Sequence, residues 1–202
     1  MYRKNVPTHE HNISISGGSG KTNYYLSGAL LDQQGLIRYG RDTFKRYNLT
    51  AKISTDITPW LTISYTNRWS RDEYSRPSYM TGLFFHNIAR RWPTNPVRDI
   101  NGHLIPGNET IQMRDGGIDR NQKDRVNQQL ILEARPMEGL LLRAGNNYNT
   151  TYNHNHWDVL AIYSYDNKGL PRLTSREGGD DGQTSVGEST WKNDYFNGRY
   201  YA

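Results

Sequence analysis

The sequence has no cysteine and few aliphatic side chains. Among its 202 residues, leucine, isoleucine, valine and phenylalanine together number only 38. Without cysteine there are no disulfide bonds and no zinc–thiolate sites. No apolar run approaches the roughly 18 residues of a membrane-spanning helix, and the first residues lack the apolar segment of a signal peptide. We therefore expect a chain that stays where it is made or that belongs to a longer one.

Aromatic and polar side chains take the place of the missing aliphatic ones. Few aliphatic residues with a high net charge would indicate disorder. Here the net charge is only +5, and 15 tyrosines and 5 tryptophans supply large amphipathic rings. This composition is typical of β-structure. The basic residues are too scattered to form a nucleic-acid-binding tail, so we expect no nucleic-acid partner.

Alternation of apolar and polar residues is the strongest signal in the sequence. From residue 46 to 57 every second residue is apolar except Thr55, and the residues between are polar. The stretch from Leu61 to Trp69 alternates in the same way, with Asn67 as its exception. Such a pattern sorts residues onto the two faces of a strand. It predicts six strands, near residues 11–17, 22–31, 44–57, 60–70, 125–136 and 140–152.

The connections between these strands alternate between short and long. The longest are predicted loops at 71–124 and 153–192, and a seventh strand begins near residue 195. In an up-and-down meander this alternation places all tight turns at one end and all long loops at the other, as in bacterial outer-membrane barrels. The fold class predicted is therefore all-β: an antiparallel up-and-down meander that forms part of a transmembrane barrel, about six to seven strands with long extracellular loops.

Strand length and tryptophan placement agree with a membrane location. Strands of about 10 residues match a tilted crossing of the bilayer, but six of them cannot close a transporter-sized barrel. Trp60 at the tight-turn end and Trp69 at the long-loop end would lie at the two headgroup levels. The alternative is a soluble antiparallel β domain with one wet face, such as a glycan-binding module.

Several short motifs invite a chemical interpretation that their context does not favour. Residues 17–22 (GGSGKT) lack the first glycine of a phosphate-binding loop and are followed by a strand, so a hairpin turn is expected. The pairs His9/His11 and His154/His156 have no evident third metal ligand. Residues 99–102 and 178–182 have calcium-loop composition without the remaining ligands.

No arrangement of catalytic residues can be proposed. The sequence contains no nucleophile-elbow pattern, and adjacent acids in a loop cannot flank a glycosidic bond. We expect no enzyme activity, no cofactor and no metal.

The ordered set of strand and turn sequences resembles the SusC/RagA family of TonB-dependent outer-membrane transporters. The resemblance covers most of the chain up to about residue 152. The matching segments are PTHEHNISISGG (7–18), TNYYLS (22–27), LDQQGLI (31–37), RYNL (46–49), WL (60–61), PTNPV (93–97), DING (99–102) and GL (139–140).

The resemblance implies a barrel of about 22 strands, closed by an N-terminal plug domain, in the outer membrane of a Gram-negative cell. Such a transporter imports oligosaccharides or peptides together with a SusD-like surface lipoprotein, and the TonB complex drives it. This chain carries no TonB box, plug domain or terminal barrel strand. We therefore expect an internal barrel segment that transports nothing alone.

Two groups of candidate functional residues follow. The loop at 71–124 is rich in aromatic and basic side chains, and a short helix is expected between Leu83 and Trp92. Its side chains are expected either to contact substrate or the lipoprotein or to pack only on each other: Tyr74, Tyr79, Phe84, Phe85, Arg91 and Trp92. On the polar strand faces, four charged residues are expected to line the lumen: Lys52, Arg68, Glu133 and Arg143.

Overall fold

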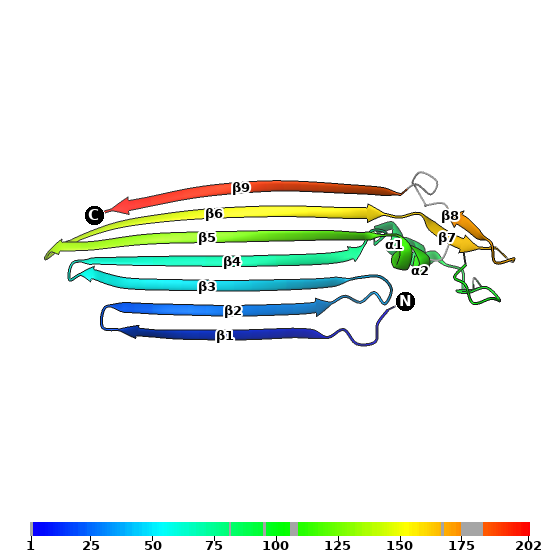
Figure 1. The fold of residues 1–202 in the computed structure, drawn as a ribbon, viewed down its shortest axis with the longest axis horizontal. Coiled ribbons are helices and arrows are strands. Elements are labelled where there is room, and N and C mark those ends of the chain that lie inside the picture. Colours follow the sequence, from blue (N-terminus) through cyan, green and yellow to red (C-terminus); the bar gives the residue numbers. More distant parts are fainter. Residues whose placement is uncertain (1, 81, 95, 106–108, 167, 175–183) are drawn as a thin grey trace.

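The protein consists of one long antiparallel sheet with a small cap of loops at one end (Figure 1). The computed structural model describes residues 2–80, 82–94, 96–105, 109–166, 168–174 and 184–202. The sheet strands follow chain order: β1 (Thr8–Ser19), β2 (Thr22–Gln34), β3 (Thr43–Thr58), β4 (Leu61–Pro77), β5 (Ile118–Met137), β6 (Leu140–Val159) and β9 (Ser185–Tyr201). The predicted all-β up-and-down meander is confirmed.

Tight turns and long connections lie at opposite ends of the sheet, as predicted. Residues 20–21, 59–60 and 138–139 form the tight turns at one end (Figure 1, left). The other end carries the longer connections, with α1 (Gly82–Arg90), α2 (Glu109–Asp115) and the hairpin of β7 (Ile162–Tyr165) and β8 (Pro171–Thr174). The expected helix between Leu83 and Trp92 corresponds to α1.

The strands extend further toward the long connections than the sequence predicted. We call the end of the sheet that carries the long connections its upper end. The stretch 71–124 includes the upper part of β4 and the start of β5, and 153–192 includes the end of β6 and the start of β9. Tyr74 thus lies in a strand rather than in a loop. Cross-strand ion pairs hold these extensions, with Arg71 Nε 2.8 Å from Asp124 Oδ1 and Arg76 NH2 2.8 Å from Asp119 Oδ2. Because both faces are charged here, alternation in hydropathy disappears, although the strands continue.

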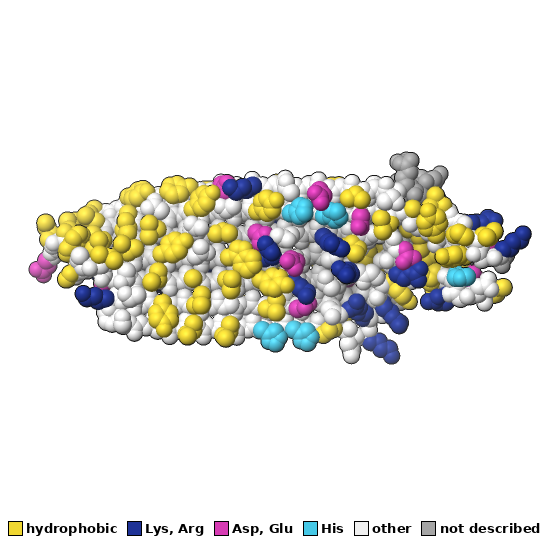
Figure 2. All heavy atoms as spheres, viewed as in Figure 1, with side chains coloured by type: hydrophobic (Ala, Val, Ile, Leu, Met, Phe, Trp, Pro, Cys, Tyr) yellow, Lys and Arg dark blue, Asp and Glu magenta, His cyan; other side chains and the backbone are white. Residues whose placement is uncertain are grey.

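The two faces of the sheet differ in polarity along its tight-turn half. One face carries aliphatic and aromatic side chains that nothing in the described chain covers; Ile13 is 78% exposed and Leu49 is 52% exposed. Figure 2 shows this face, with hydrophobic side chains over the tight-turn half and charged ones toward the long connections. The other face is polar; for example, the Ser54 and Ser64 hydroxyls lie 2.7 Å apart, and Asn127 donates to Asn147 at 3.0 Å.

Apart from Pro77, the last residue of β4, the fully buried apolar side chains of the described residues lie in the loop cap and not in the seven-stranded sheet. They form two clusters, Ile37, Phe84 and Met113 in the first and Leu104, Ile111 and Ile162 in the second. Tyr79 packs against both. A soluble sheet buries one face against a second layer. Here the small core fixes the connections, while the sheet itself has no covering layer.

The sheet ends in two unpaired edges. In the described residues β1 pairs only with β2, and β9 pairs only with β6, so the seven strands form an open sheet. Exposed strand edges of this length favour pairing with further strands.

The turn between β5 and β6 depends on a glycine. Gly139 has φ +79°, a conformation that costs an L-residue roughly 1–2 kcal/mol. We expect Gly139→Ala to lower the free energy of unfolding by about 1 kcal/mol, measured by urea titration.

Gly20, in the turn between β1 and β2, provides the matched control for this prediction. It has ordinary φ and open space where a Cβ would lie. Gly20→Ala should leave stability within about 0.5 kcal/mol of the parent. Equal losses for both variants would contradict this account of the turn.

Candidate functional site

The exposed apolar face of the sheet is the first candidate functional surface. We name it the apolar band; it consists of Ile13, Ile15, Tyr24, Leu26, Leu49, Ile53, Leu61, Ile63, Tyr65, Trp69, Val126, Leu130, Leu132, Tyr148 and Phe196. On β4 the band runs from Leu61 to Trp69, about the 9–11 residues that a tilted strand needs to cross the hydrocarbon layer. An uncovered apolar surface of this extent marks an interface with lipid or protein.

Polar groups within the apolar band have partners from neighbouring strands. Asn146 accepts a hydrogen bond from the Tyr200 hydroxyl at 2.6 Å. Asp194 accepts from the Tyr148 hydroxyl at 3.0 Å and lies 2.8 Å from Lys192 Nζ. Paired polar groups cost far less to remove from water than unpaired ones. The band therefore tolerates them without losing its apolar character.

Aromatic rings mark the upper edge of the band. Trp69 lies opposite Leu49 and Val126, and one step higher Tyr47 and Tyr152 occupy the same face. The Arg71 guanidinium lies 5.5 Å from the Trp69 ring centroid. Amphipathic rings at such a boundary are typical of the membrane interface. Trp60 lies in the tight turn at the other end of the band, half exposed.

The four charged residues predicted to line a lumen all lie on the polar face of the sheet. Lys52 pairs in register with Thr66, and Arg68 pairs with Thr50. Glu133 lies opposite Arg143, with Oε1 3.2 Å from Arg143 Nε. A polar cavity of about 510 Å³ opens on this face between β5, β6 and β9. The shared face is established; that it encloses a channel stays a prediction.

The structure separates the six loop residues that the sequence grouped together. Phe84 is 2% exposed and lies in the first core cluster, with its ring 5.1 Å from that of Phe85. Tyr79 is packed between the two clusters, and Tyr74 lies half-buried in β4 opposite Phe44. Phe84 and Tyr79 therefore pack within the protein, whereas Tyr74 lines a polar pocket beside the strand.

The other three loop residues differ in their environment: two are exposed aromatic rings and one is an arginine in an ion pair. Phe85 is half exposed and Trp92 is 75% exposed, so both present ring surface to solvent. Arg91 is held by Glu109 of α2; its Nε lies 3.0 Å from each carboxylate oxygen, and NH2 lies 2.7 Å from Oε1. Glu109 is only 4% exposed. Arg91 thus has an internal electrostatic role that the sequence did not reveal, because its partner lies 18 positions along the chain.

The calcium-like motif at 99–102 is a turn whose aspartate is hydrogen-bonded within the turn itself. Asp99 Oδ1 accepts hydrogen bonds from the backbone N–H groups of Asn101 and His103, each at 2.8 Å. Desolvation raises the pKa of Asp99, but these bonds and the His103 ring lower it by more, so the carboxyl pKa lies below its usual range. The carboxylate oxygens of Asp99 therefore stabilise the turn. The second calcium-like motif, at 178–182, lies outside the described residues.

Of the remaining chemical motifs, the glycine-rich one forms a turn. Residues 17–22 form the β1–β2 hairpin, as expected. His156 Nδ1 lies 3.0 Å from Glu188 Oε1, and the described residues contain no cluster of three potential metal ligands.

No protein-family model and no curated protein matches the sequence. Neither helix of the described chain has the length and apolar character that spanning a membrane would require. The resemblance to the SusC/RagA transporters therefore stays a prediction.

The buried ion pair of Arg91 and Glu109 yields a test of the loop cap. In Arg91→Gln the nearly buried Glu109 carboxylate loses its cation. We expect this loss to destabilise the cap by about 2–3 kcal/mol, which is less than for a fully buried pair because Arg91 is part-exposed. We expect limited proteolysis to cut the connection between β4 and β5 at least tenfold faster.

Arg114→Gln is the control for this test. Arg114 pairs with Asp115 at the surface, where both partners are well exposed, so its loss should change stability by less than about 1 kcal/mol. Equal protease sensitivity of the two variants would show that Arg91 does not hold the cap.

Proposed function

We propose that this chain forms part of the barrel wall of a TonB-dependent outer-membrane transporter of the SusC/RagA kind. The transporter imports oligosaccharides or peptides across the outer membrane of a Gram-negative cell, together with a SusD-like lipoprotein. The observation that carries the proposal is the uncovered apolar band on one face of a sheet whose other face is polar. The chain contributes no catalysis.

The energetics of the sheet support a lipid environment. In lipid, each backbone N–H and C=O needs a partner within the protein, which a continuous antiparallel ladder supplies. Apolar side chains that face hydrocarbon need no second layer. A closed barrel also removes sheet edges, so the free edges of β1 and β9 fit a segment that pairs with further strands of the same barrel.

The arrangement of the connections supports the orientation. Outer-membrane barrels keep short turns on the periplasmic side and longer loops on the outside. The loop cap would then lie at the cell surface, where a lipoprotein and substrate arrive. Exposed Phe85 and Trp92 are the side chains of the cap that we assign to this contact, and the polar face with Lys52, Arg68, Glu133 and Arg143 would line the channel.

A single charge on each face tests the membrane assignment. Leu130 lies in the middle of the apolar band, and its neighbour Gln129 points to the polar face. A lysine at the bilayer midplane costs about 2–4 kcal/mol. Leu130→Lys should therefore lower the free energy of unfolding in lipid vesicles by that amount. Urea titration in vesicles measures it on the full-length protein.

Gln129→Lys is the matched control and should cost less than about 0.5 kcal/mol. If the chain were instead a soluble glycan-binding module, Leu130→Lys would raise solubility and the protein would be a monomer in water without detergent. That result would contradict the transporter assignment.

Trp92 tests the contact with the lipoprotein. A largely exposed tryptophan that docks on a partner as a binding hot spot contributes about 2 kcal/mol or more, so Trp92→Ala should weaken retention of the lipoprotein on the tagged full-length transporter by roughly thirtyfold. Ile100→Ala is the control, since Ile100 has the most exposed apolar side chain among the described residues of the same connection. Unchanged retention with Trp92→Ala would end this assignment of Trp92.

A further inference from the structure

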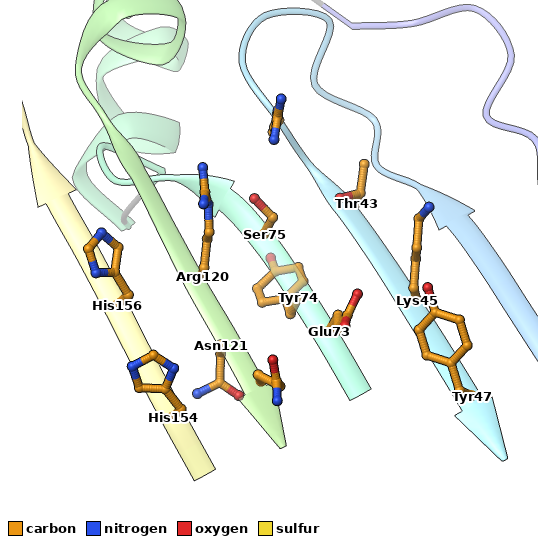
Figure 3. A pocket seen from close by; sticks show the side chains of 12 residues that line it. Thr43, Lys45, Tyr47, Glu73, Tyr74, Ser75, Arg120, Asn121, His154 and His156 are labelled. Atoms are coloured by element: carbon orange, nitrogen blue, oxygen red, sulfur yellow. The ribbon is translucent and has the colours of Figure 1, made fainter. Parts of the chain in front are cut away.

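A polar pocket opens on the same face as the apolar band, directly beyond its aromatic edge. Strands β3, β4, β5 and β6 all contribute side chains to it (Figure 3). Its volume is about 470 Å³, and the residues on its face of the sheet are Thr43, Lys45, Tyr47, Glu73, Ser75, Arg120, Gln122, His154 and His156, with Arg41 at its upper rim.

The lining of this pocket favours an anion. Arg41, Lys45 and Arg120 outnumber its one carboxylate, Glu73. Lys45 shares its charge with Asp32, with Nζ 3.2 Å from Oδ2. Within the described chain, Arg41 and Arg120 have no carboxylate at ion-pair distance, and both are exposed. Two such cations beside hydroxyl and imidazole groups match a phosphate.

An apolar groove lies beside the pocket. It has a volume of about 350 Å³, and its apolar walls come from Ile13, Leu30, Leu49 and Trp69. Its floor is open because Gly28, between Ile13 and Leu49 in the sheet, has no side chain; a Cβ there would still be 3.5 Å from Leu49. The groove has the shape and chemistry of a site for a hydrocarbon chain.

Tyr47 joins the two cavities, since its side chain lines both. On β3 the order along this face is Leu49, Tyr47, Lys45 and Thr43, so apolar, aromatic and basic groups follow one another away from the band. Tyrosine at such a boundary lies at headgroup level in a bilayer. The composite site therefore changes from apolar to cationic at the depth where a phospholipid changes from acyl chains to its anionic phosphate.

We propose that this composite site binds one lipid with a phosphate-bearing headgroup. The phosphate lies between Arg41 and Arg120, and one acyl chain occupies the groove beside Gly28. The inference rests on the proposed function, because it takes this face of the sheet as the lipid-facing one. Free phosphate has the same chemistry as the lipid headgroup but no acyl chain. Only the lipid can therefore occupy the groove as well as the pocket.

Native mass spectrometry of the full-length protein in detergent tests this site with phosphatidylglycerol as the probe. We expect one phosphatidylglycerol to be retained, diacylglycerol of the same chains to be retained more weakly, and millimolar inorganic phosphate not to displace the lipid. Each basic residue near a membrane surface contributes about a fivefold gain in affinity, so Arg41→Gln with Arg120→Gln should weaken retention about thirtyfold. Gly28→Leu fills the groove and should also abolish tight retention.

The opposite face supplies matched controls. Arg68→Gln with Arg199→Gln removes two charges from the polar face, and Gly145→Leu adds the same side chain there, where a Cβ meets nothing closer than 3.9 Å. Both controls should retain phosphatidylglycerol like the parent. Equal retention in the test and control variants, or displacement by inorganic phosphate, would overturn the proposed lipid site.

Heat-modifiable mobility on gels reports folding of every variant separately. A parent protein that folds in detergent and binds phosphatidylglycerol without dependence on Arg41, Arg120 or Gly28 would refute this site alone. A parent that does not enter lipid vesicles at all would instead refute the proposed function. Loss of retention in a variant whose mobility matches the parent supports the site.

Discussion

The structure depends on one constraint: a sheet whose backbone is paired strand to strand leaves one apolar face uncovered. In water this face would be a large cost, since apolar surface contributes about 25 cal/mol per Å² when buried. Soluble antiparallel sheets meet that cost with a second layer. Here the fully buried apolar side chains of the described residues, such as Phe84 and Met113, belong to the loop cap, apart from Pro77 at the end of β4. The proposed environment, lipid on one face and a wet channel on the other, makes a covering layer unnecessary.

The division of the strands into two halves follows from the same constraint. Along β4, apolar residues from Leu61 to Trp69 give way to Arg71, which pairs with Asp124 across the sheet. The apolar side chains of the first half are compatible with the hydrocarbon layer, and the charged side chains of the second half are compatible with lipid headgroups and water. In the second half ion pairs on both faces keep the strands together, and at their ends the connections pack into a core of their own. The polar pocket and apolar groove lie where the halves meet, which is why an amphipathic ligand fits there.

Much of the fold could be predicted from the sequence because a period of two is a local signal. Ile53 and Lys52 differ by one position, and their opposite faces follow directly from strand geometry. The upper strand ends could not be found in this way, since Arg71 and Asp124 are 53 positions apart and only their pairing shows that both lie in strands. The burial of Phe84 depends on distant Ile37 and Met113, and no local pattern reveals it.

Site-directed spin labels provide the most direct measurement of the central claim, and these 202 residues contain no cysteine that would compete for the label. Labels at positions 49 to 54 of β3 in the full-length protein in lipid vesicles can be probed with oxygen, which enters lipid, and with a water-soluble nickel chelate. The account predicts high oxygen access at 49, 51 and 53 and high nickel access at 50, 52 and 54. Labels at 49, 51 and 53 that are shielded from both reagents, or reached equally by nickel, would contradict it.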